Sequence, residues 1–268
     1  MVGYLGPIHS FTYQAASTFY MQGELLPYGN FHLLFEALDK DLVEGIVVPI
    51  ENSIEGTVNV VQDKLLEYGF QINREIVMDI RLSLISKSNQ LETIKYVISN
   101  PVALQQCRNT LSKELGKYKE VYEDSTSKAV KNLFELDETY AAVASEENVL
   151  GELNILLNDC QDYQQNQTRF LFIKKTLEVI GLHNKTSIVI TPQVEVSGAL
   201  YDILHEFAIR SINLTKIESR PSKEELGSYK FYIDFEGNIE DQVVKDAIAI
   251  LTHKSKSIKL LGSYYSKK

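Results

Sequence analysis

The sequence predicts an α/β protein with two lobes, followed by a smaller ferredoxin-like domain. From residue 2 to about residue 175, short β-branched runs alternate with helical stretches, the pattern of a sheet with helices on both faces. Residues 70–87 alternate polar and apolar side chains over about twice the usual strand length, which indicates a strand crossing between two lobes. From residue 186 onward the predicted order is βαββαβ, the ferredoxin-like split motif.

The first part contains short β-branched runs, expected to be strands, and helical stretches between them. The expected strands are residues 2–5, 46–50, 96–99, 121–122, 140–144 and 170–173, and the expected helices are residues 12–21, 31–38, 58–68, 102–115 and 127–133. Residues 153–157 are expected to return the chain to the first lobe. Lobe 1 then comprises about residues 1–76 and 153–176, lobe 2 comprises about residues 77–152, and a cleft separates them.

The pattern loosens around residues 174–185, and a second domain is predicted over residues 186–268. Its expected strands are residues 186–191, 212–219, 228–235 and 258–264, and its expected helices are residues 197–209 and 239–253. A domain of roughly 80 residues is of ordinary size.

Composition excludes several classes of protein. The formal charge of -9 over 268 residues argues against a nucleic-acid binder, because phosphate neutralisation needs a basic face. The N-terminal residues lack the features of a signal peptide and no apolar run reaches membrane-spanning length, so a cytoplasmic protein without membrane contact is expected. Cys107 and Cys160 are lone thiols and the five His are scattered, so neither a disulfide nor a metal site is expected.

Polar residues follow two of the predicted strands. Glu51, Asn52 and Ser53 come directly after the apolar strand that ends at residue 50. Ser99 ends a strand of the second lobe, and Gln106 lies in the second turn of the helix after it. The carboxyl ends of strands are where α/β clefts hold ligand contacts, although a helix-capping turn explains Asn52 as well.

A Gln-rich stretch stops at Thr168-Arg169-Phe170 and becomes an apolar strand. A hydroxyl beside a guanidinium at a loop-to-strand junction is poorly explained by packing, and such junctions hold reactive side chains still while leaving them reachable. By itself, a structural turn is an equally good interpretation of this junction.

Ser125-Thr126-Ser127-Lys128 matches the SxxK motif of penicillin-recognising enzymes, but its companion motifs are missing and helix capping is favoured.

Two junctions of the second domain could hold a ligand. Gly198-Ala199-Leu200 opens its first helix, and small residues there allow close approach of another backbone or a ligand. Glu218-Ser219-Arg220 precedes a proline at the end of its second strand, where an arginine can also be merely solvated.

Taken together, these motifs resemble the prephenate dehydratases of the monofunctional bacterial type, over nearly the whole chain. The residues that carry the resemblance are GPIHSFTYQAA, VVPIENSIEGTVN, SNPVALQQC, EDSTSKA, AAVASE and NQTRFLFI, followed by SGAL and ESRPS. The resemblance implies a bilobal, periplasmic-binding-protein-like catalytic domain over residues 1–176 and an ACT regulatory domain over residues 186–268. It implies conversion of prephenate to phenylpyruvate, CO2 and water in L-phenylalanine biosynthesis, without metal or organic cofactor, feedback inhibition by phenylalanine, and a homodimer or homotetramer formed through the ACT domains.

The resemblance also implies roles for individual residues. Thr168 matches the essential hydroxyl of the family; Asn52, Ser99 and Gln106 match polar residues of the substrate site, and Glu51, Ser53 and Arg169 are their neighbours. Phenylalanine is expected near Gly198, Ala199, Leu200, Glu218, Ser219 and Arg220. The chain departs from the family at His9, where Gly is usual, at Asn100, where others carry His, and at Ser197, which replaces a frequent Pro.

The motifs leave the mechanism partly open. No His, Cys or carboxylate pair suited to strong acid catalysis is present in them, so Thr168 is the candidate that hydrogen-bonds or protonates the leaving hydroxyl. Arg169 either assists this donation or binds a substrate carboxylate. A non-catalytic amino-acid sensor and an extracytoplasmic solute-binding protein are the rival interpretations; Thr168-Arg169-Phe170 favours the enzyme, because a sensor has no need of it.

Overall fold

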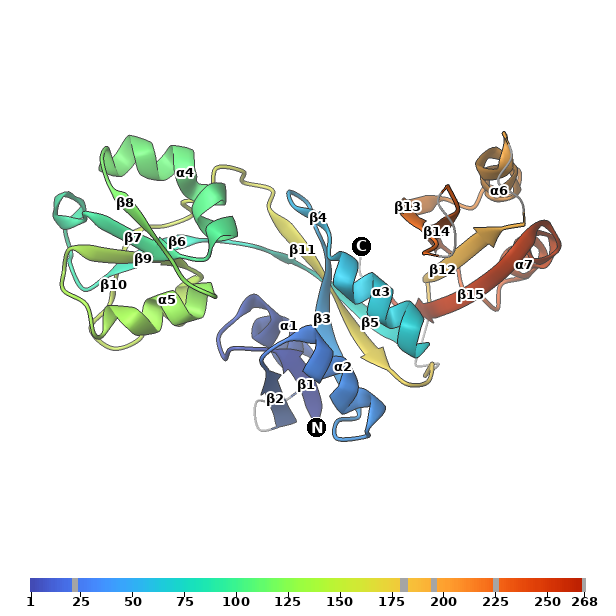
Figure 1. Ribbon diagram of the computed structural model, residues 1–268, viewed down its shortest axis with the longest axis horizontal. Coiled ribbons are helices and arrows are strands. Elements are labelled where there is room, and N and C mark those ends of the chain that lie inside the picture. Colours follow the sequence, from blue (N-terminus) through green and yellow to red (C-terminus); the bar gives the residue numbers. More distant parts are fainter. Residues whose placement is uncertain (21–23, 179–182, 194–196, 224–226, 267–268) are drawn as a thin grey trace. The chain divides into compact units, whose positions relative to one another are not determined.

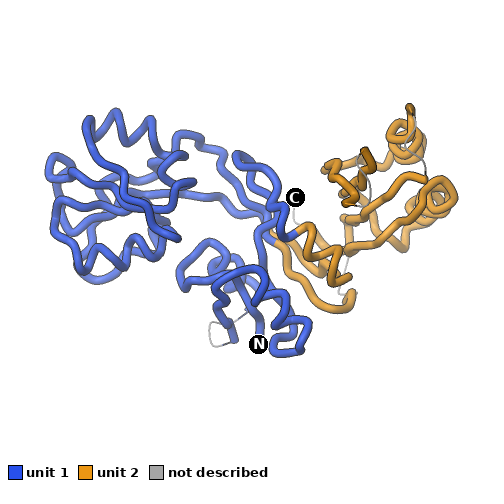
Figure 2. Tube along the Cα trace, viewed as in Figure 1, with its two compact units in different colours: residues 1–61, 77–170 blue, residues 62–76, 171–268 orange. Residues whose placement is uncertain are grey.

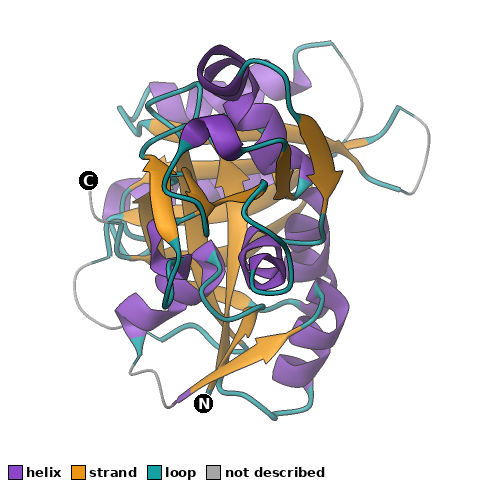
Figure 3. Cartoon of the chain, turned by 90° about the vertical axis from the view of Figure 1, so that its left-hand side faces the viewer, coloured by secondary structure: helices purple, strands orange, loops and turns teal. Residues whose placement is uncertain are grey.

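The computed structural model describes residues 1–20, 24–178, 183–193, 197–223 and 227–266. Helices and strands are mixed throughout this part of the chain, and the strands form three sheets (Figures 1 and 3). The predicted mixed α/β class is therefore confirmed. Within these residues no helix is both long and apolar enough to cross a membrane.

The first sheet has the strand order β2-β1-β3-β11-β5, and the short β4 pairs with β3. Its strands are β1 (Val2–Leu5), β2 (Leu25–Tyr28), β3 (Gly45–Asn52), β4 (Gly56–Thr57), β5 (Gln71–Asp79) and β11 (Gln167–Lys174). The helices between these strands are α1 (Phe11–Phe19), α2 (Phe31–Asp39) and α3 (Asn59–Tyr68). β1 is parallel to both β2 and β3. The sequence missed β2, an edge strand that contains Pro27, because proline weakens a strand signal and is tolerated only at edges and bulges.

The second sheet has the order β10-β6-β9-β7-β8. Its strands are β6 (Ser83–Ser86), β7 (Tyr96–Ser99), β8 (Lys119–Tyr122), β9 (Tyr140–Ala144) and β10 (Asn154–Leu157). Its helices are η2 (Leu91–Thr93), α4 (Pro101–Leu115), α5 (Thr126–Leu133) and η3 (Glu146–Asn148). α5 packs Ala129, Val130 and Leu133 against buried strand residues of this sheet. Two sheets with their own helices confirm the predicted bilobal architecture.

The predicted crossing over residues 70–87 is real, but a single long strand is wrong. β5 belongs to the first sheet and β6 to the second, and residues 80–82 between them are not in a strand. There the backbone N–H of Ile80 donates to the Asn166 carbonyl, and that of Leu82 donates to Gln161 Oε1. These bonds to the returning segment replace the sheet pairing that would have continued the strand.

The expected return to the first lobe at residues 153–157 is also wrong. β10 pairs antiparallel with β6 in the second sheet, and the chain reaches the first sheet only with β11. An apolar run predicts a strand but not the edge that accepts it, which is why the sequence placed this segment incorrectly. The domain limits of residues 1–176 and 186–268 stay a prediction.

The third sheet has the order β13-β14-β12-β15, with antiparallel pairing at each step. Its elements are β12 (Lys185–Pro192), α6 (Ala199–Ala208), β13 (Leu214–Pro221), β14 (Tyr229–Glu236), α7 (Gln242–Lys254) and β15 (Ser255–Tyr264). One core unites both helices with one face of the sheet, including Ile188, Phe207, Phe235 and Leu251. The predicted βαββαβ motif is confirmed.

The chain divides into two compact units, residues 1–61 with 77–170 and residues 62–76 with 171–268 (Figure 2). In the second unit, most of α3 and the first two thirds of β5 belong with the ferredoxin-like domain. A Cβ atom on Gly262 of β15 would collide with the carbonyl oxygen of Ile72 in β5, so glycine permits this close approach. Lys185 and Glu75 form an ion pair at 3.0 Å in the same unit.

A buried carboxylate in α6 should make this domain sensitive to acid. The Glu206 side chain is 6% exposed and accepts hydrogen bonds from Lys254 and Arg210. The hydrogen bond from Lys254, together with Arg210, lowers the pKa of Glu206 despite the opposing effect of burial.

The pKa of Glu206 is lower in the folded state than its value of 4.5 in the unfolded chain. The ionised carboxylate therefore stabilises the fold fully above pH 4.5, and this stabilisation is lost as the pH falls through the pKa of the folded state. We therefore expect Glu206→Gln to lower the midpoint of urea unfolding at neutral pH. The gap between the midpoints of the variant and the unsubstituted protein should close in acid. Glu240→Gln is the control, since Glu240 is 70% exposed in its pair with Lys245 and should change the midpoint little. A gap that stays constant down to about pH 3 would contradict this account.

Candidate active site

Asn52 and Thr168 meet where two neighbouring strands of the first sheet hold them. Asn52 is the last residue of β3 and Thr168 is the second residue of β11. The Asn52 Nδ2 atom donates to Thr168 Oγ1 at 2.9 Å, and Thr168 is only 8% exposed. Two residues predicted from separate motifs, 116 positions apart, are therefore in direct contact.

Asn166 joins this pair to the second lobe. Its Oδ1 accepts from Asn52 Nδ2 at 2.8 Å, and its Nδ2 donates to Gln106 Oε1 in α4 at 2.9 Å. Asn166 is 1% exposed, so its amide is shielded from solvent and bonds to these two side chains. Asn166 begins the NQTRFLFI motif, but nothing in the sequence singles it out, because its side-chain partners lie in distant segments.

Glu51 and Arg169 form a second pair on the same two strands. The Arg169 Nη1 atom lies 3.7 Å from Glu51 Oε2. Consecutive residues of a strand point to opposite faces, so this pair and the Asn52–Thr168 pair lie on different faces of the sheet. Of the two roles left open for Arg169, this alternation disfavours direct assistance to Thr168.

Ser53 holds the segment that precedes Thr168. Its Oγ donates to the Gln165 carbonyl at 3.1 Å and accepts from the Gln167 N–H at 2.9 Å. Its own N–H donates to the Gln167 carbonyl at 2.8 Å. These bonds fix residues 165–167 beside the end of β3.

The side chain of Ser99 bonds outside this cluster. It is fully buried, and its hydroxyl donates to the Val143 carbonyl at 2.6 Å. This bond gives Ser99 a structural contact inside the second sheet. Its substrate-binding role stays a prediction.

A second set of hydrogen bonds joins the two lobes near α1. Gln14 Nε2 donates to Ser145 Oγ at 3.0 Å, and Asn148 Nδ2 donates to the His9 carbonyl at 3.2 Å. His9 adopts φ 66°, a left-handed conformation that glycine takes most easily. The family's usual glycine and this His are therefore compatible with the same backbone, at some conformational cost.

Ser10, Asn100 and Ser125 cap the helices around the site, and for Ser125 capping was also the interpretation favoured from the sequence; Asn52 instead accepts from the N–H groups of Ile54 and Glu55, in a turn before α3. Ser10 Oγ accepts from the Tyr13 N–H at the start of α1, and Ser125 Oγ accepts from the Lys128 N–H at the start of α5. Asn100 Oδ1 accepts from the Ala103 N–H at 2.7 Å in α4. The family departure at Asn100 therefore supplies a favourable N-cap.

The residues predicted to bind phenylalanine occupy two places in the second unit. Gly198, with φ 93°, caps α6, and Ala199 and Leu200 begin that helix; Ser197, the third departure from the family, precedes it and is exposed. Glu218, Ser219 and Arg220 lie in β13, where Glu218 and Arg220 contact α3. Gln62 Nε2 donates to Glu218 Oε2 at 3.2 Å, and Asp63 lies 3.4 Å from Arg220 and 2.7 Å from Lys223.

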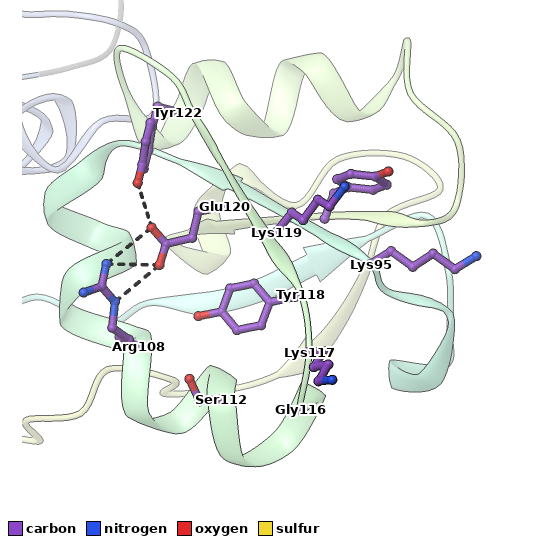
Figure 4. Close-up of a pocket in the computed structure, with 10 residues that line it drawn as sticks. Lys95, Arg108, Ser112, Gly116, Lys117, Tyr118, Lys119, Glu120 and Tyr122 are labelled. Carbon is purple, nitrogen blue, oxygen red and sulfur yellow. Dashed lines mark hydrogen bonds and ion pairs between the residues drawn. The ribbon is translucent and has the colours of Figure 1, made fainter.

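A separate cavity of about 1060 Å³ lies on α4 and β8 of the second lobe (Figure 4). Arg108 and Tyr122 converge on the carboxylate of Glu120, and Lys119 lies over the Tyr96 ring. Gly116 marks the carboxyl end of α4, and cations are favourable at such helix ends. None of the predicted site residues lines this cavity, so we place the active site elsewhere.

The two cysteines are free and buried, with their sulfur atoms 3.6 Å apart. The hydrogen bond between the two thiols and burial both raise the pKa of Cys107, so it behaves as a protonated, apolar residue. Across the ranges that the structure describes, no three His, Cys, Asp or Glu side chains are grouped as metal ligands would be.

Comparison with known proteins identifies relatives over the whole chain. The family model for prephenate dehydratase matches residues 2–178. The prephenate dehydratase of Methanocaldococcus jannaschii is 44% identical over 236 residues, covering 86% of this chain and 84% of that protein. The bifunctional chorismate mutase/prephenate dehydratase of Aquifex aeolicus is 42% identical over 98% of this chain and 73% of its own length. The crystal structure of prephenate dehydratase from Arthrobacter aurescens in complex with L-Phe superposes with a TM-score of 0.88 at 32% identity, covering 99% of this chain and 89% of that one.

Proposed function

Because the chain belongs to the prephenate dehydratase family, we propose that it converts prephenate to phenylpyruvate, CO2 and water in L-phenylalanine biosynthesis. The observation that carries the proposal is the cluster of Thr168, Asn52, Asn166 and Gln106, which gathers one hydroxyl and three amides from three segments. Hydroxyl and amide groups suit a substrate with two carboxylates, a ketone and a leaving hydroxyl.

The reaction needs one proton and no external electrons. The bond from the ring to its carboxylate breaks and releases CO2, its electron pair enters the ring, and the bond to the ring hydroxyl breaks. The hydroxyl leaves as water and receives one proton as its bond to the ring breaks, and solvent replaces that proton on the donor. Aromatisation drives these changes, so the protein has mainly to hold the dianion and assist the departing oxygen.

Thr168 is the group assigned to the departing oxygen. A threonine hydroxyl is too weak an acid to protonate it beforehand, so donation is concerted with cleavage of the carbon–oxygen bond. Because the protein carries a formal charge of -9, local donors such as Asn52 and Gln106 are needed to hold a dianion against long-range repulsion. Glu51 with Arg169, and Ser53, then support the site from the two strand ends, and Ser99 is proposed as a further contact.

The activity is tested by ultraviolet detection of phenylpyruvate from prephenate, with and without a metal chelator. We expect turnover in both samples. Absence of turnover by the purified, folded protein would refute the enzyme and favour the amino-acid sensor. Activity that is lost on chelation and restored by a divalent metal would show a metal requirement.

We further propose that the ferredoxin-like domain is an ACT regulatory domain through which phenylalanine inhibits the enzyme. Gly198 to Leu200 and Glu218 to Arg220 are the residues assigned to the effector. A cavity of about 410 Å³ lies against Arg220, Asp63 and Tyr232, within the size range of small-molecule sites. The relative from Arthrobacter aurescens was crystallised with L-Phe.

The contacts of β13 with α3 suggest how the effector acts on catalysis. α3 begins seven residues after Asn52 along the chain. Its residues Gln62 and Asp63 bind Glu218 and Arg220 of the ESRP motif. A change in β13 on effector binding would therefore act on the helix that follows Asn52 along the chain.

Asp63→Asn should weaken this coupling without abolishing activity. Coupling of about 1 to 3 kcal/mol corresponds to a roughly 5- to 150-fold loss of apparent prephenate affinity on effector binding, and we expect that factor to fall toward one in the variant. The measurement is prephenate affinity with and without phenylalanine, together with calorimetric binding of phenylalanine.

Glu67→Gln is the matched control, since Glu67 lines the same cavity but is exposed. Unchanged inhibition in Asp63→Asn with full effector binding would show that coupling takes another route.

We propose that the assembly is a homodimer or homotetramer formed through the ACT domains. α6 and α7 expose apolar side chains, including Leu200, Tyr201, Val243 and Ile250, which a second copy could cover. Light scattering on Tyr201→Glu should show a smaller particle than the unsubstituted protein. The cytoplasmic location stays a prediction.

A further inference from the structure

A closed ring of hydrogen bonds connects three side chains of the active-site cluster with Glu55, and it closes through the Glu55 backbone. Asn52 donates to Asn166 at 2.8 Å, Asn166 donates to Gln106 at 2.9 Å, and Gln106 donates to Glu55 Oε1 at 3.3 Å. The backbone N–H of Glu55 returns to Asn52 Oδ1 at 2.9 Å. Asn166, at 1% exposure, is the most buried of the four.

The donor and the acceptor of every bond in the ring are determined at two places, Asn52 and Glu55. Asn52 Oδ1 accepts from the backbone N–H groups of Ile54 and Glu55, which can only donate, so the NH2 end of Asn52 must face Asn166 and Thr168. Asn166 then presents its oxygen to Asn52 and its NH2 to Gln106. At the other end, the Glu55 carboxylate accepts from the NH2 of Gln106.

This direction determines what the Thr168 hydroxyl can do. Thr168 Oγ1 accepts from Asn52 Nδ2 at 2.9 Å. A hydroxyl that accepts from an NH2 group cannot donate to that same group. The Thr168 proton is therefore left for another acceptor, which dehydration supplies as the departing oxygen.

We propose that Asn166 is a positioning residue that links Asn52 to Gln106 in this ring and thereby holds the Asn52 NH2 group in the position that directs the Thr168 proton toward the substrate. This inference rests on the proposed dehydratase activity. Asn166 acts through Asn52 and Gln106, and its amide is suited to the position because it offers one acceptor and one donor in opposite directions. An aspartate has the same shape but offers only acceptors when ionised.

Asn166→Asp tests this role through a pH profile. The ionised carboxylate cannot donate to Gln106 Oε1, so the ring is disrupted, and we expect kcat to fall about 10- to 100-fold at about pH 8, the range typical for loss of a residue that orients another functional side chain. Burial raises the pKa of the new carboxyl above its ordinary value of about 3.9. Once protonated, it again supplies one acceptor and one donor. The ratio of wild-type to variant kcat should therefore decrease as pH is lowered toward about 5.

Gln164→Glu is the control for charge, because it adds one negative charge to the same segment at an exposed position. We expect its kcat to match wild type at every pH. Asn166→Ala, which carries no titratable group, should lose kcat to a similar degree without recovery at low pH, and far-ultraviolet circular dichroism gives the folded fraction of each variant.

Three results distinguish the possible failures. A wild-type kcat in Asn166→Asp, or a deficit that is constant across the pH range, would overturn the positioning role. A deficit that follows only the folded fraction would assign Asn166 to stability. Lack of prephenate turnover by the wild-type protein would instead refute the proposed function, independently of Asn166.

Discussion

Thr168→Val should lower kcat about 10²- to 10³-fold, as expected for loss of one donor that acts on charge developing in the transition state. Valine keeps the size of threonine and removes the hydroxyl that Asn52 holds at 2.9 Å. Because that hydroxyl is proposed to act on the departing oxygen, the loss should be seen in kcat more than in KM. The measurement is steady-state phenylpyruvate formation by both proteins.

Folding should be little affected by this substitution. After Thr168→Val, the Asn52 Nδ2 atom still has Asn166 Oδ1 and the Gln167 carbonyl as acceptors, so no buried donor is left unpaired. We expect a loss of less than about 1.5 kcal/mol in the free energy of unfolding. Thr168→Ser is the matched control, since it retains the hydroxyl and should keep most of the turnover. A folded Thr168→Val protein with near wild-type kcat would remove Thr168 from the mechanism.

Lys185→Met should cause the largest loss of stability among the substitutions considered. Lys185 Nζ donates to both carboxylate oxygens of Glu75, at 3.0 and 3.1 Å, and the Glu75 side chain is 2% exposed. Without the ammonium, this buried carboxylate loses the ion pair that both of its oxygens make with Lys185, and breaking a buried pair typically lowers the free energy of unfolding by about 3 to 5 kcal/mol. The measurement is urea denaturation of both proteins at the same pH. The midpoints are compared provided that the dependence of the unfolding free energy on urea concentration is unchanged.

Two further variants separate the buried charge from simple loss of packing. Adding Glu75→Gln to Lys185→Met should recover much of the stability, because the buried negative charge is then absent. Lys245→Met removes an ion pair whose partners are 48% and 70% exposed, and should cost less than about 1 kcal/mol. A Lys185→Met protein as stable as Lys245→Met would show that the Glu75–Lys185 pair contributes little.

The sequence alone was sufficient to predict most of the individual helices and strands. β-branched runs and their alternation predicted β1, β7, β9 and the βαββαβ order of residues 185–264, because strand and helix periodicity are local properties. Asn52 was visible as a polar residue after a strand end and Thr168 as a hydroxyl before a strand, whereas Gln106 was selected through its match to the family motifs.

What the sequence could not provide was pairing between distant segments. Residues 153–157 were correctly predicted as a strand but assigned to the wrong lobe, since local periodicity says nothing about which sheet edge accepts a strand. Neither did the adjacency of Thr168 and Arg169 reveal that the pleat of β11 points them to opposite faces; that required knowing that the strand begins at Gln167.

By itself, the sequence determined the classes of element and the ferredoxin-like order of the C-terminal part, and it pointed to candidate positions for chemistry, since these depend on side chains within a few residues of each other. Only the tertiary structure decided that Asn166 connects Asn52 to Gln106, across 114 and 60 positions, and that Gln62 and Asp63 meet the ESRP motif. The direction of a hydrogen bond depends on which donor and acceptor face each other. That is settled only when distant strands and helices have packed together.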